Sequence, residues 1–167
     1  LAYRNHPLPI GEGQTISQPY IVALSTDLIA PEPHHTVLEV GTGSGYQAAV
    51  LAEIVHRVYS IEILESLGVA ASIALKDLQY KNIEIKIGDG YKGWPERAPF
   101  DAIVVTAAAP QVPAALVEQL KPGGSMVIPV GASAGAQDLL LVKKLADQTV
   151  TTRIILPVRF VPLVPGR

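Results

Sequence analysis

Apolar residues recur along this chain with two periods, and each period indicates a different element. Compact apolar runs rich in valine and isoleucine are typical of buried strands and occur at residues 37–40, 57–61, 101–106 and 125–130. Between them, apolar side chains with the spacing of one helix face cover residues 19–29, 46–54, 67–78 and 114–120. In residues 83–87 isoleucine alternates with charged residues, which predicts an edge strand with one solvated face.

The end of the chain has a different pattern. Residues 138–144 and 149–157 are strand-like runs separated by a short polar turn, as in an antiparallel hairpin. The repeated strand and helix units before them require a mostly parallel sheet, with right-handed crossovers that place helices on both faces. We therefore predict an α/β fold with a doubly wound, mostly parallel, Rossmann-like sheet and a C-terminal antiparallel hairpin at one edge.

Turn-forming residues mark two further segments. Residues 1–13 contain two prolines and two glycines without a helix or strand period, which predicts an ordered loop. Residues 121–124, Lys-Pro-Gly-Gly, predict a tight turn before the strand that follows.

Length and charge limit the organisation of the chain. With 167 residues we expect a single domain over residues 1–167, and because the first residue is Leu1 we expect the full protein to have residues upstream. The net charge of −2 disfavours a nucleic-acid partner, and the longest apolar stretch is interrupted, so we expect no membrane partner. The absence of cysteine fits a cytoplasmic protein. We expect a monomer.

Three closely spaced glycines join the first buried strand to a helix. Gly41, Gly43 and Gly45 allow a ligand to approach the backbone of this turn closely. In open parallel sheets ligands bind beyond the carboxyl ends of the strands, where Glu62 and Asp89 also lie. Glu62 follows Gly41 at the sequence spacing at which a carboxylate can accept hydrogen bonds from a ribose diol. Asp89 is suited to accept a hydrogen bond from an adenine amine. The pattern predicts a nucleoside site.

The spacing of the glycines restricts the class of ligand that the turn can bind. A dinucleotide site usually has Gly-x-Gly-x-x-Gly, whereas this turn is Gly-x-Gly-x-Gly with Glu39 just before it and no lysine or arginine nearby. Such a turn suits a nucleoside with an amino-acid tail better than a pyrophosphate. S-adenosyl-L-methionine has this structure.

Four segments together resemble the protein-L-isoaspartate O-methyltransferase family of class I S-adenosylmethionine-dependent methyltransferases. They are residues 14–20, 37–47, 88–90 and 157–163, and the similarity extends over nearly the whole chain. The resemblance implies a protein-L-isoaspartate(D-aspartate) O-methyltransferase that methylates the α-carboxylate of L-isoaspartyl residues in damaged proteins and peptides and releases S-adenosyl-L-homocysteine. The methyl ester then collapses to a succinimide, which initiates repair.

The predicted site has two parts. The predicted cofactor ligands are Glu39, Gly41, Thr42, Gly43, Ser44, Gly45, Glu62, Asp89, Gly90 and Thr106. The resemblance places the acceptor peptide against Thr15, Ile16, Ser17, Ala108, Pro110, Val158, Arg159 and Val161.

Ser17 is the predicted catalytic residue. By resemblance it occupies the family's active-site position, where a hydroxyl donates to the acceptor carboxylate without adding charge. A carboxylate with a pKa of about 4 is already ionised at pH 7, so the reaction needs alignment rather than a strong base. The alternative is that Ser17 only bonds to backbone at the start of a helix.

Other interpretations remain open at this point. The chain could methylate a small molecule or a nucleic acid, or it could be a catalytically silent nucleoside-binding module. Arg159 could bind the substrate carboxylate or pair with a surface acid. The histidines are His6, His34, His35 and His56, and they lack the spacing of a metal site, so we predict no metal.

Overall fold

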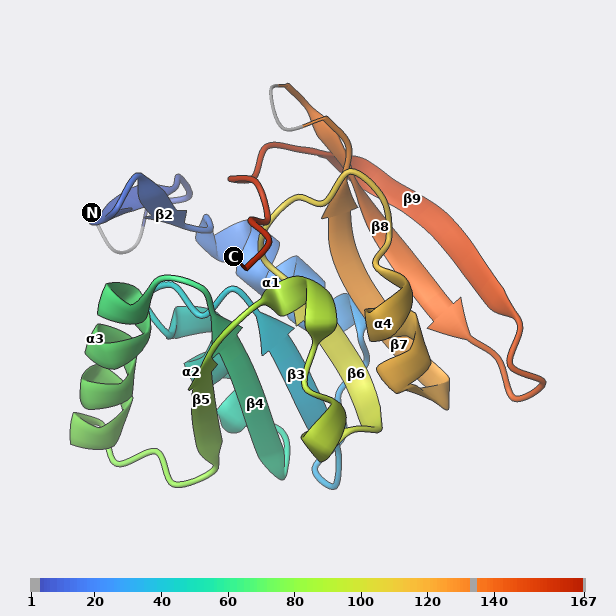
Figure 1. Cartoon of the computed structure of the whole chain (residues 1–167), viewed down its shortest axis with the longest axis horizontal. Helices are drawn as coiled ribbons and strands as arrows, with labels where there is room; N and C mark the ends of the chain where they lie inside the picture. Colours follow the sequence, from blue (N-terminus) through green and yellow to red (C-terminus); the bar gives the residue numbers. More distant parts are fainter. Residues whose placement is uncertain (1–3, 133–134, 167) are drawn as a thin grey trace.

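The computed structural model describes residues 4–132 and 135–166, and a seven-stranded sheet with the order β5-β4-β3-β6-β7-β8-β9 forms its centre (Figure 1). The strands are β3 Thr36–Val40, β4 Arg57–Glu62, β5 Ile83–Ile87, β6 Phe100–Val105, β7 Leu120–Val130, β8 Gln137–Lys144 and β9 Val150–Val158. Neighbours from β5 to β7 pair in parallel, whereas β8 pairs antiparallel with β7 and β9. The predicted mostly parallel sheet with an antiparallel edge hairpin is confirmed.

Helices cover both faces of this sheet. The helices are α1 Pro19–Leu28, α2 Tyr46–Ala52, α3 Glu65–Asp77 and α4 Ala114–Gln119, with short 3-10 helices at Gly90–Lys92 and Pro95–Arg97. One apolar core joins α1, α2 and α3 to the face that carries Val37 and Val104. A second core joins α4 and Trp94 to the face that carries Leu38 and Ile103. Within the described residues, no helix is long and apolar enough to cross a membrane.

Two local predictions are wrong. Part of the expected N-terminal loop forms a hairpin of β1 Leu8–Gly11 and β2 Gln14–Ile16, because Gly11 and Gly13 adopt positive φ and reverse the chain; residues 1–3 lie outside the described residues. The expected turn at residues 121–124 lies inside β7, since Leu120 already pairs with Phe100. Gly123, with a φ of 84°, lies where the register between β6 and β7 shifts, so these residues form an irregularity within the strand instead of a turn before it.

The strand order places the predicted site at the carboxyl ends of the parallel strands. β5 is the edge strand and β6 lies at the centre beside β3, as their apolar patterns predict. Parallel registry pairs Val40 with Ile61 on one side and with Val105 on the other, so the turns after β3, β4 and β6 lie next to one another. The β1–β2 hairpin and the C-terminal end of the chain lie over these carboxyl ends (Figure 1).

Candidate active site

The glycine turn after β3 is built for close contact. Gly41, Gly43 and Gly45 all have positive φ, of 99°, 52° and 85°, and α2 starts directly after them. A Cβ atom on Gly41 would lie 2.4 Å from Thr106 Oγ1. The Thr106 hydroxyl donates to the carbonyl oxygen of Gly41 over 2.6 Å and so holds the turn against the end of β6. Glycine at position 41 is therefore required by both space and conformation.

Glu62 reaches across from the end of β4 to the same turn. Its Oε2 accepts from the backbone N–H of Gly43 over 2.8 Å, and its Oε1 accepts from the N–H of Leu64 over 3.0 Å. These two bonds fix the carboxylate beside the turn. Each carboxylate oxygen has a second lone pair that can accept from a ligand hydroxyl.

Glu39 lies beneath the turn instead of facing a cavity. Its side chain is fully buried, and Ser60 donates to its Oε1 over 2.5 Å while the hydroxyls of Ser60 and Thr42 also lie 2.5 Å apart. Oε2 has no hydrogen-bond partner among the described residues. Burial raises the pKa of Glu39 to about 8, against the opposing effect of the Ser60 hydrogen bond, so the carboxyl is mostly protonated at pH 7.

Two cavities meet at the carboxyl ends of the parallel strands. The turn cavity, about 190 Å³, lies between the glycine turn, Glu62 and the residues above them, and the Ser17 cavity, about 420 Å³, lies beside it. The linings of both include Thr15, Thr106 and Val161. A small cleft lined by Ser17, Thr106 and the turn connects them. Two ligands bound in these cavities would lie next to each other at the cleft.

The structure brings together most of the predicted site residues. The turn cavity and the cleft are lined by Ile16, Gly41, Thr42, Gly43, Ser44, Glu62, Gly90 and Thr106, and the Ser17 cavity by Thr15, Ser17, Val158, Arg159 and Val161. In the described structure, five predicted residues lie outside these linings: Glu39, Gly45, Asp89, Ala108 and Pro110.

Asp89 and Ala108, two of the positions outside the linings, make structural hydrogen bonds. Asp89 Oδ1 accepts from the N–H of Tyr91 over 2.9 Å at the start of a 3-10 helix. The N–H of Ala108 donates to the Val161 carbonyl oxygen, and the N–H of Leu163 donates to the Ala108 carbonyl oxygen, both over 2.8 Å. Pro110 is exposed. The chain's own C-terminal segment therefore uses the backbone groups of Ala108, a residue that we expected the acceptor peptide to contact.

Ser17 lies at the junction of the Ser17 cavity and the connecting cleft. Its side chain is half-buried, and within the described residues its hydroxyl has no hydrogen bond. Gln18 is the N-cap of α1 and has no capping side-chain hydrogen bond. The alternative that Ser17 serves only to bond the helix start has no contact to support it.

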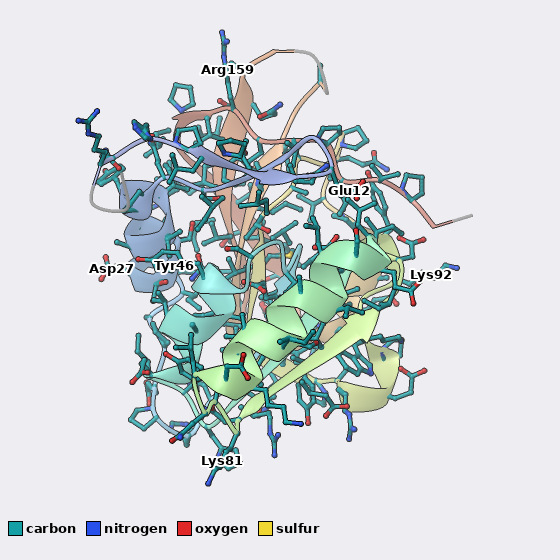
Figure 2. All side chains as sticks on the ribbon, turned by 90° about the vertical axis from the view of Figure 1, so that its left-hand side faces the viewer. Glu12, Asp27, Tyr46, Lys81, Lys92 and Arg159 are labelled. Carbon is teal, nitrogen blue, oxygen red and sulfur yellow. The ribbon has the colours of Figure 1, made fainter. Side chains whose placement is uncertain are left out.

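Several residues that cover the two cavities were not among the predicted site residues. Ile10, Glu12 and Gln14 of the hairpin line the turn cavity, and Tyr20 and Phe160 line the Ser17 cavity. The Gly-Glu-Gly run between two short extended segments was the signal for this hairpin. Figure 2 shows Glu12 above α3, and it shows Arg159 at the outer end of the molecule with its side chain pointing into solvent. Arg159 therefore lies at the mouth of the Ser17 cavity and not in its depth.

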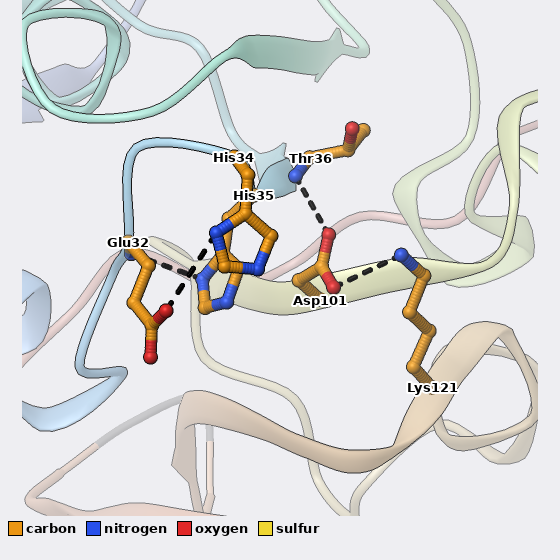
Figure 3. Close-up of polar contacts among 6 residues, drawn as sticks. All are labelled: Glu32, His34, His35, Thr36, Asp101 and Lys121. Carbon is orange, nitrogen blue, oxygen red and sulfur yellow. Dashed lines mark hydrogen bonds and ion pairs between the residues drawn. The ribbon is translucent and has the colours of Figure 1, made fainter.

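The opposite end of the sheet holds a cluster of two histidines and a carboxylate. Ligand atoms of Glu32, His34 and His35 lie within 4.8 Å of one another (Figure 3). His35 Nδ1 already accepts from the N–H of Glu32 over 3.1 Å, and in this tautomer Nε2 carries the proton. Glu32 and His34 are exposed. The expected absence of a metal site stays a prediction.

Comparisons with known proteins agree on one family. A family model described as Protein-L-isoaspartate(D-aspartate) O-methyltransferase matches residues 1–167. "Protein-L-isoaspartate O-methyltransferase 2" of Polaromonas sp. is 63% identical over 166 residues, which cover 99% of this chain and 79% of the relative. "Protein-L-isoaspartate O-methyltransferase 1" of Cupriavidus necator is 66% identical over 163 residues, which cover 98% of this chain and 63% of the relative.

Solved structures give the same result. A protein-L-isoaspartate O-methyltransferase superposes with a TM-score of 0.86 at 32% identity, over 95% of this chain and 51% of that protein. A Plasmodium falciparum protein described as a beta-aspartate methyltransferase, in complex with S-adenosyl-L-homocysteine, superposes with a TM-score of 0.84 at 27% identity, over 98% of this chain and 82% of that one. The chain thus spans between about half and four fifths of these proteins.

Proposed function

The chain belongs to the protein-L-isoaspartate(D-aspartate) O-methyltransferase family, and from this premise we propose that it methylates the α-carboxylate of L-isoaspartyl residues in damaged proteins and peptides. The methyl donor is S-adenosyl-L-methionine, and the methyl ester collapses to a succinimide that permits repair. The observation that carries the proposal is that the turn cavity and the Ser17 cavity share Thr15, Thr106 and Val161 in their linings, with Ser17 in the cleft between them.

The turn cavity fits a nucleoside with an amino-acid tail. The positive φ values of Gly41 and Gly43 allow the ligand to approach the backbone, and Glu62 presents two acceptor oxygens to a ribose diol. The charged side chains that the structure places in this lining are Glu12 and Glu62, both acidic. An acidic lining suits a cationic sulfonium and disfavours the phosphates of a dinucleotide.

The Ser17 cavity fits the acceptor. The Ser17 hydroxyl is free within the described residues to donate to one oxygen of the isoaspartyl carboxylate, which leaves the other oxygen to attack. S-adenosyl-L-methionine supplies a methyl group whose bond to sulfur breaks as the bond to the carboxylate oxygen forms, so the positive and negative charges are both neutralised. The half-buried position of Ser17 limits the water that would solvate the attacking oxygen.

Glu39 has an indirect role in this proposal. Its carboxyl contacts the turn through Ser60 and Thr42, and Thr42 lines the connecting cleft. We therefore assign Glu39 to the support of the turn and not to direct cofactor contact. Asp89 bonds to the N–H of Tyr91 and so fixes the start of the 3-10 helix that begins with Gly90, a residue of the turn-cavity lining.

Methyl transfer to a matched pair of peptides tests the proposal. Labelled S-adenosyl-L-methionine should methylate an isoaspartyl peptide and not the same peptide with normal aspartate. Equal labelling of both, or of neither by the full-length protein, contradicts the substrate assignment. Transfer to another acceptor alone would favour the alternative methyltransferase, and cofactor binding without any transfer would favour the silent module.

We further propose that residues 1–167 form a single domain that acts as a monomer in the cytoplasm, without nucleic-acid or membrane partners. The lack of cysteine and the net charge of −2 support this proposal. Light scattering should give the mass of one chain, 17.7 kDa. A mass near twice that value contradicts the monomer.

A further inference from the structure

Gln137 is a buried glutamine that joins two distant segments of the chain. It is the first residue of β8 and is 2% exposed. Its Nε2 donates to the carbonyl oxygens of Ala132 and Gly135, each over 3.2 Å, and its Oε1 accepts from the N–H of Phe160 over 2.8 Å. One side chain therefore connects the loop before β8 to the segment after β9 and uses its acceptor and both of its donors.

Both of these segments line the Ser17 cavity. Ala136 comes from the loop before β8, and Val158, Arg159, Phe160 and Val161 come from the end of β9 and the residues after it. Among the described residues this side of the cavity has no helix. Beyond the β8–β9 ladder, which ends at the pair Gln137 and Val158, its shape depends on hydrogen bonds between irregular segments. The buried side chain of Gln137 makes three of these hydrogen bonds.

Backbone hydrogen bonds complete the same side of the cavity. The N–H of Gly131 donates to the Ala109 carbonyl oxygen over 3.0 Å, which attaches the loop before β8 to the residues after β6. The N–H of Ala108 donates to the Val161 carbonyl oxygen over 2.8 Å, which attaches the same residues to the C-terminal segment. Gln137 joins the loop to the C-terminal segment directly, so the three segments are held in a closed ring of contacts.

We propose that Gln137 is a positioning residue for the acceptor: by bonding Ala132 and Gly135 to Phe160, it sets the shape of the Ser17 cavity and hence the affinity for the isoaspartyl peptide. This inference rests on the proposed function. The cofactor side depends on other contacts, because Thr106 holds the turn and Glu62 bonds to Gly43 and Leu64. Loss of the Gln137 bonds should therefore affect the peptide much more than the cofactor.

Gln119 provides a matched control within the same chain. It is 8% exposed, its Oε1 accepts from the N–H of Trp94 over 2.8 Å, and its Nε2 donates to the Lys92 carbonyl oxygen over 2.9 Å. It thus also joins two segments through a buried amide. In the described structure it borders a separate surface hollow next to α4 and lies outside the linings of the turn cavity and the Ser17 cavity.

The test compares Gln137→Met with Gln119→Met, which remove the same amide from the two places. In Gln137→Met we expect the peptide KM to rise about tenfold while kcat and the cofactor Kd change by less than about twofold, because the altered contacts lie on the peptide side. In Gln119→Met we expect the melting temperature to fall by about as much as in Gln137→Met, while the peptide KM stays unchanged. Calorimetry with S-adenosyl-L-homocysteine measures the cofactor side.

A second variant keeps the test decisive if Gln137→Met does not fold. Gln137→Asn retains the amide but is one methylene shorter, so it cannot keep all three hydrogen bonds, and we expect a smaller rise in peptide KM, of about threefold. An unchanged peptide KM in the Gln137 variants, or an equal rise in Gln119→Met, overturns the positioning role. Wild-type protein that fails to methylate the isoaspartyl peptide overturns the proposed function itself, so the two failures are distinguishable.

Discussion

Two carboxyl groups on adjacent central strands have opposite environments at opposite ends of the sheet. Asp101, near the start of β6, accepts from the N–H of Thr36 over 2.8 Å and from Lys121 Nζ over 2.9 Å (Figure 3). Burial alone would raise its pKa, but these two contacts outweigh burial and hold the pKa below its usual range. Glu39, near the end of β3, has one hydroxyl donor and a pKa raised to about 8 by burial.

This difference between Asp101 and Glu39 indicates that the amino ends of the strands serve stability and the carboxyl ends serve function. At the amino end, one carboxylate joins β3, β6 and the start of β7 with every contact charged or hydrogen-bonded. At the carboxyl end, the described residues leave Oε2 of Glu39 without a partner and the Ser17 hydroxyl free to meet a ligand. Unsatisfied polar groups reduce stability, so a free hydroxyl in a cavity lining, as at Ser17, is expected of a site that serves binding.

The largest effect should follow from removal of the Ser17 hydroxyl at the carboxyl end. In Ser17→Ala we expect kcat for the isoaspartyl peptide to fall about a hundredfold, since one aligned donor to a reacting oxygen contributes on this scale. Cofactor affinity and melting temperature should be unchanged. Ser72→Ala is the control, because its hydroxyl donates to the Gly68 carbonyl oxygen on α3 and neither residue lines the turn cavity or the Ser17 cavity. Equal loss of transfer and cofactor binding in Ser17→Ala would show a structural role.

The next effect concerns Glu39 and its dependence on pH. Because the folded pKa of about 8 exceeds the ordinary 4.5, the unfolded chain loses this proton first, and stability falls as the pH rises through that window. Gln at this position keeps an oxygen for Ser60 and cannot ionise. In Glu39→Gln we expect the free energy of unfolding at pH 8 to rise by about 2 kcal/mol, with little change at pH 4.5.

Denaturant unfolding at both pH values measures this effect, and cofactor calorimetry shows its cost to function. If Glu39 supports the turn through Ser60 and Thr42, the more stable variant should bind S-adenosyl-L-homocysteine with affinity within about threefold of wild type. A loss of more than a hundredfold would instead indicate a direct ligand role, as the sequence suggests.

Asp101 should show the opposite dependence on pH. Its folded pKa lies below the ordinary value of 3.8, so its contribution is present above pH 4 and is lost as the pH falls through the folded pKa. In Asp101→Asn we expect a loss of about 1.5 kcal/mol at pH 7, since hydrogen bonds to a charged group are weakened, and a smaller loss in acid. Methyl transfer by the folded variant should be unchanged. Reduced kcat with normal stability would contradict the separation of the two ends.

The sequence predicts regular elements and the turn well because these depend on local pattern. The alternation in residues 83–87 indicates the edge strand, and the spacing of Gly41, Gly43 and Gly45 is enough to locate the turn between β3 and α2. Sequence adjacency to the turn also suggests that Glu39 contacts the ligand. Strand alternation puts Glu39 on the same face as Val37, beneath α1 and α2 and outside the linings of the cavities.

Local sequence pattern cannot predict contacts between residues that are far apart in the chain. Thr36 and Asp101 are 65 residues apart, and Gln137 and Phe160 meet only because β8 and β9 form a hairpin. A buried glutamine has no periodic signal of its own. The N-terminal hairpin escapes prediction because its strands are only four and three residues long, too short for a period to emerge.

The smallest effect should come from Lys121, and it measures how much of the amino-end network is electrostatic. Lys121 Nζ lies on a side chain that is 41% exposed, whereas Asp101 is 16% exposed, so solvent screens the pair from one side. In Lys121→Met we expect a loss of about 0.5 kcal/mol, because Asp101 keeps the Thr36 N–H. A double-mutant cycle with Asp101→Asn should give a coupling below about 1 kcal/mol. A larger coupling would mean that the charge pair, and not the bond to β3, holds the amino end together.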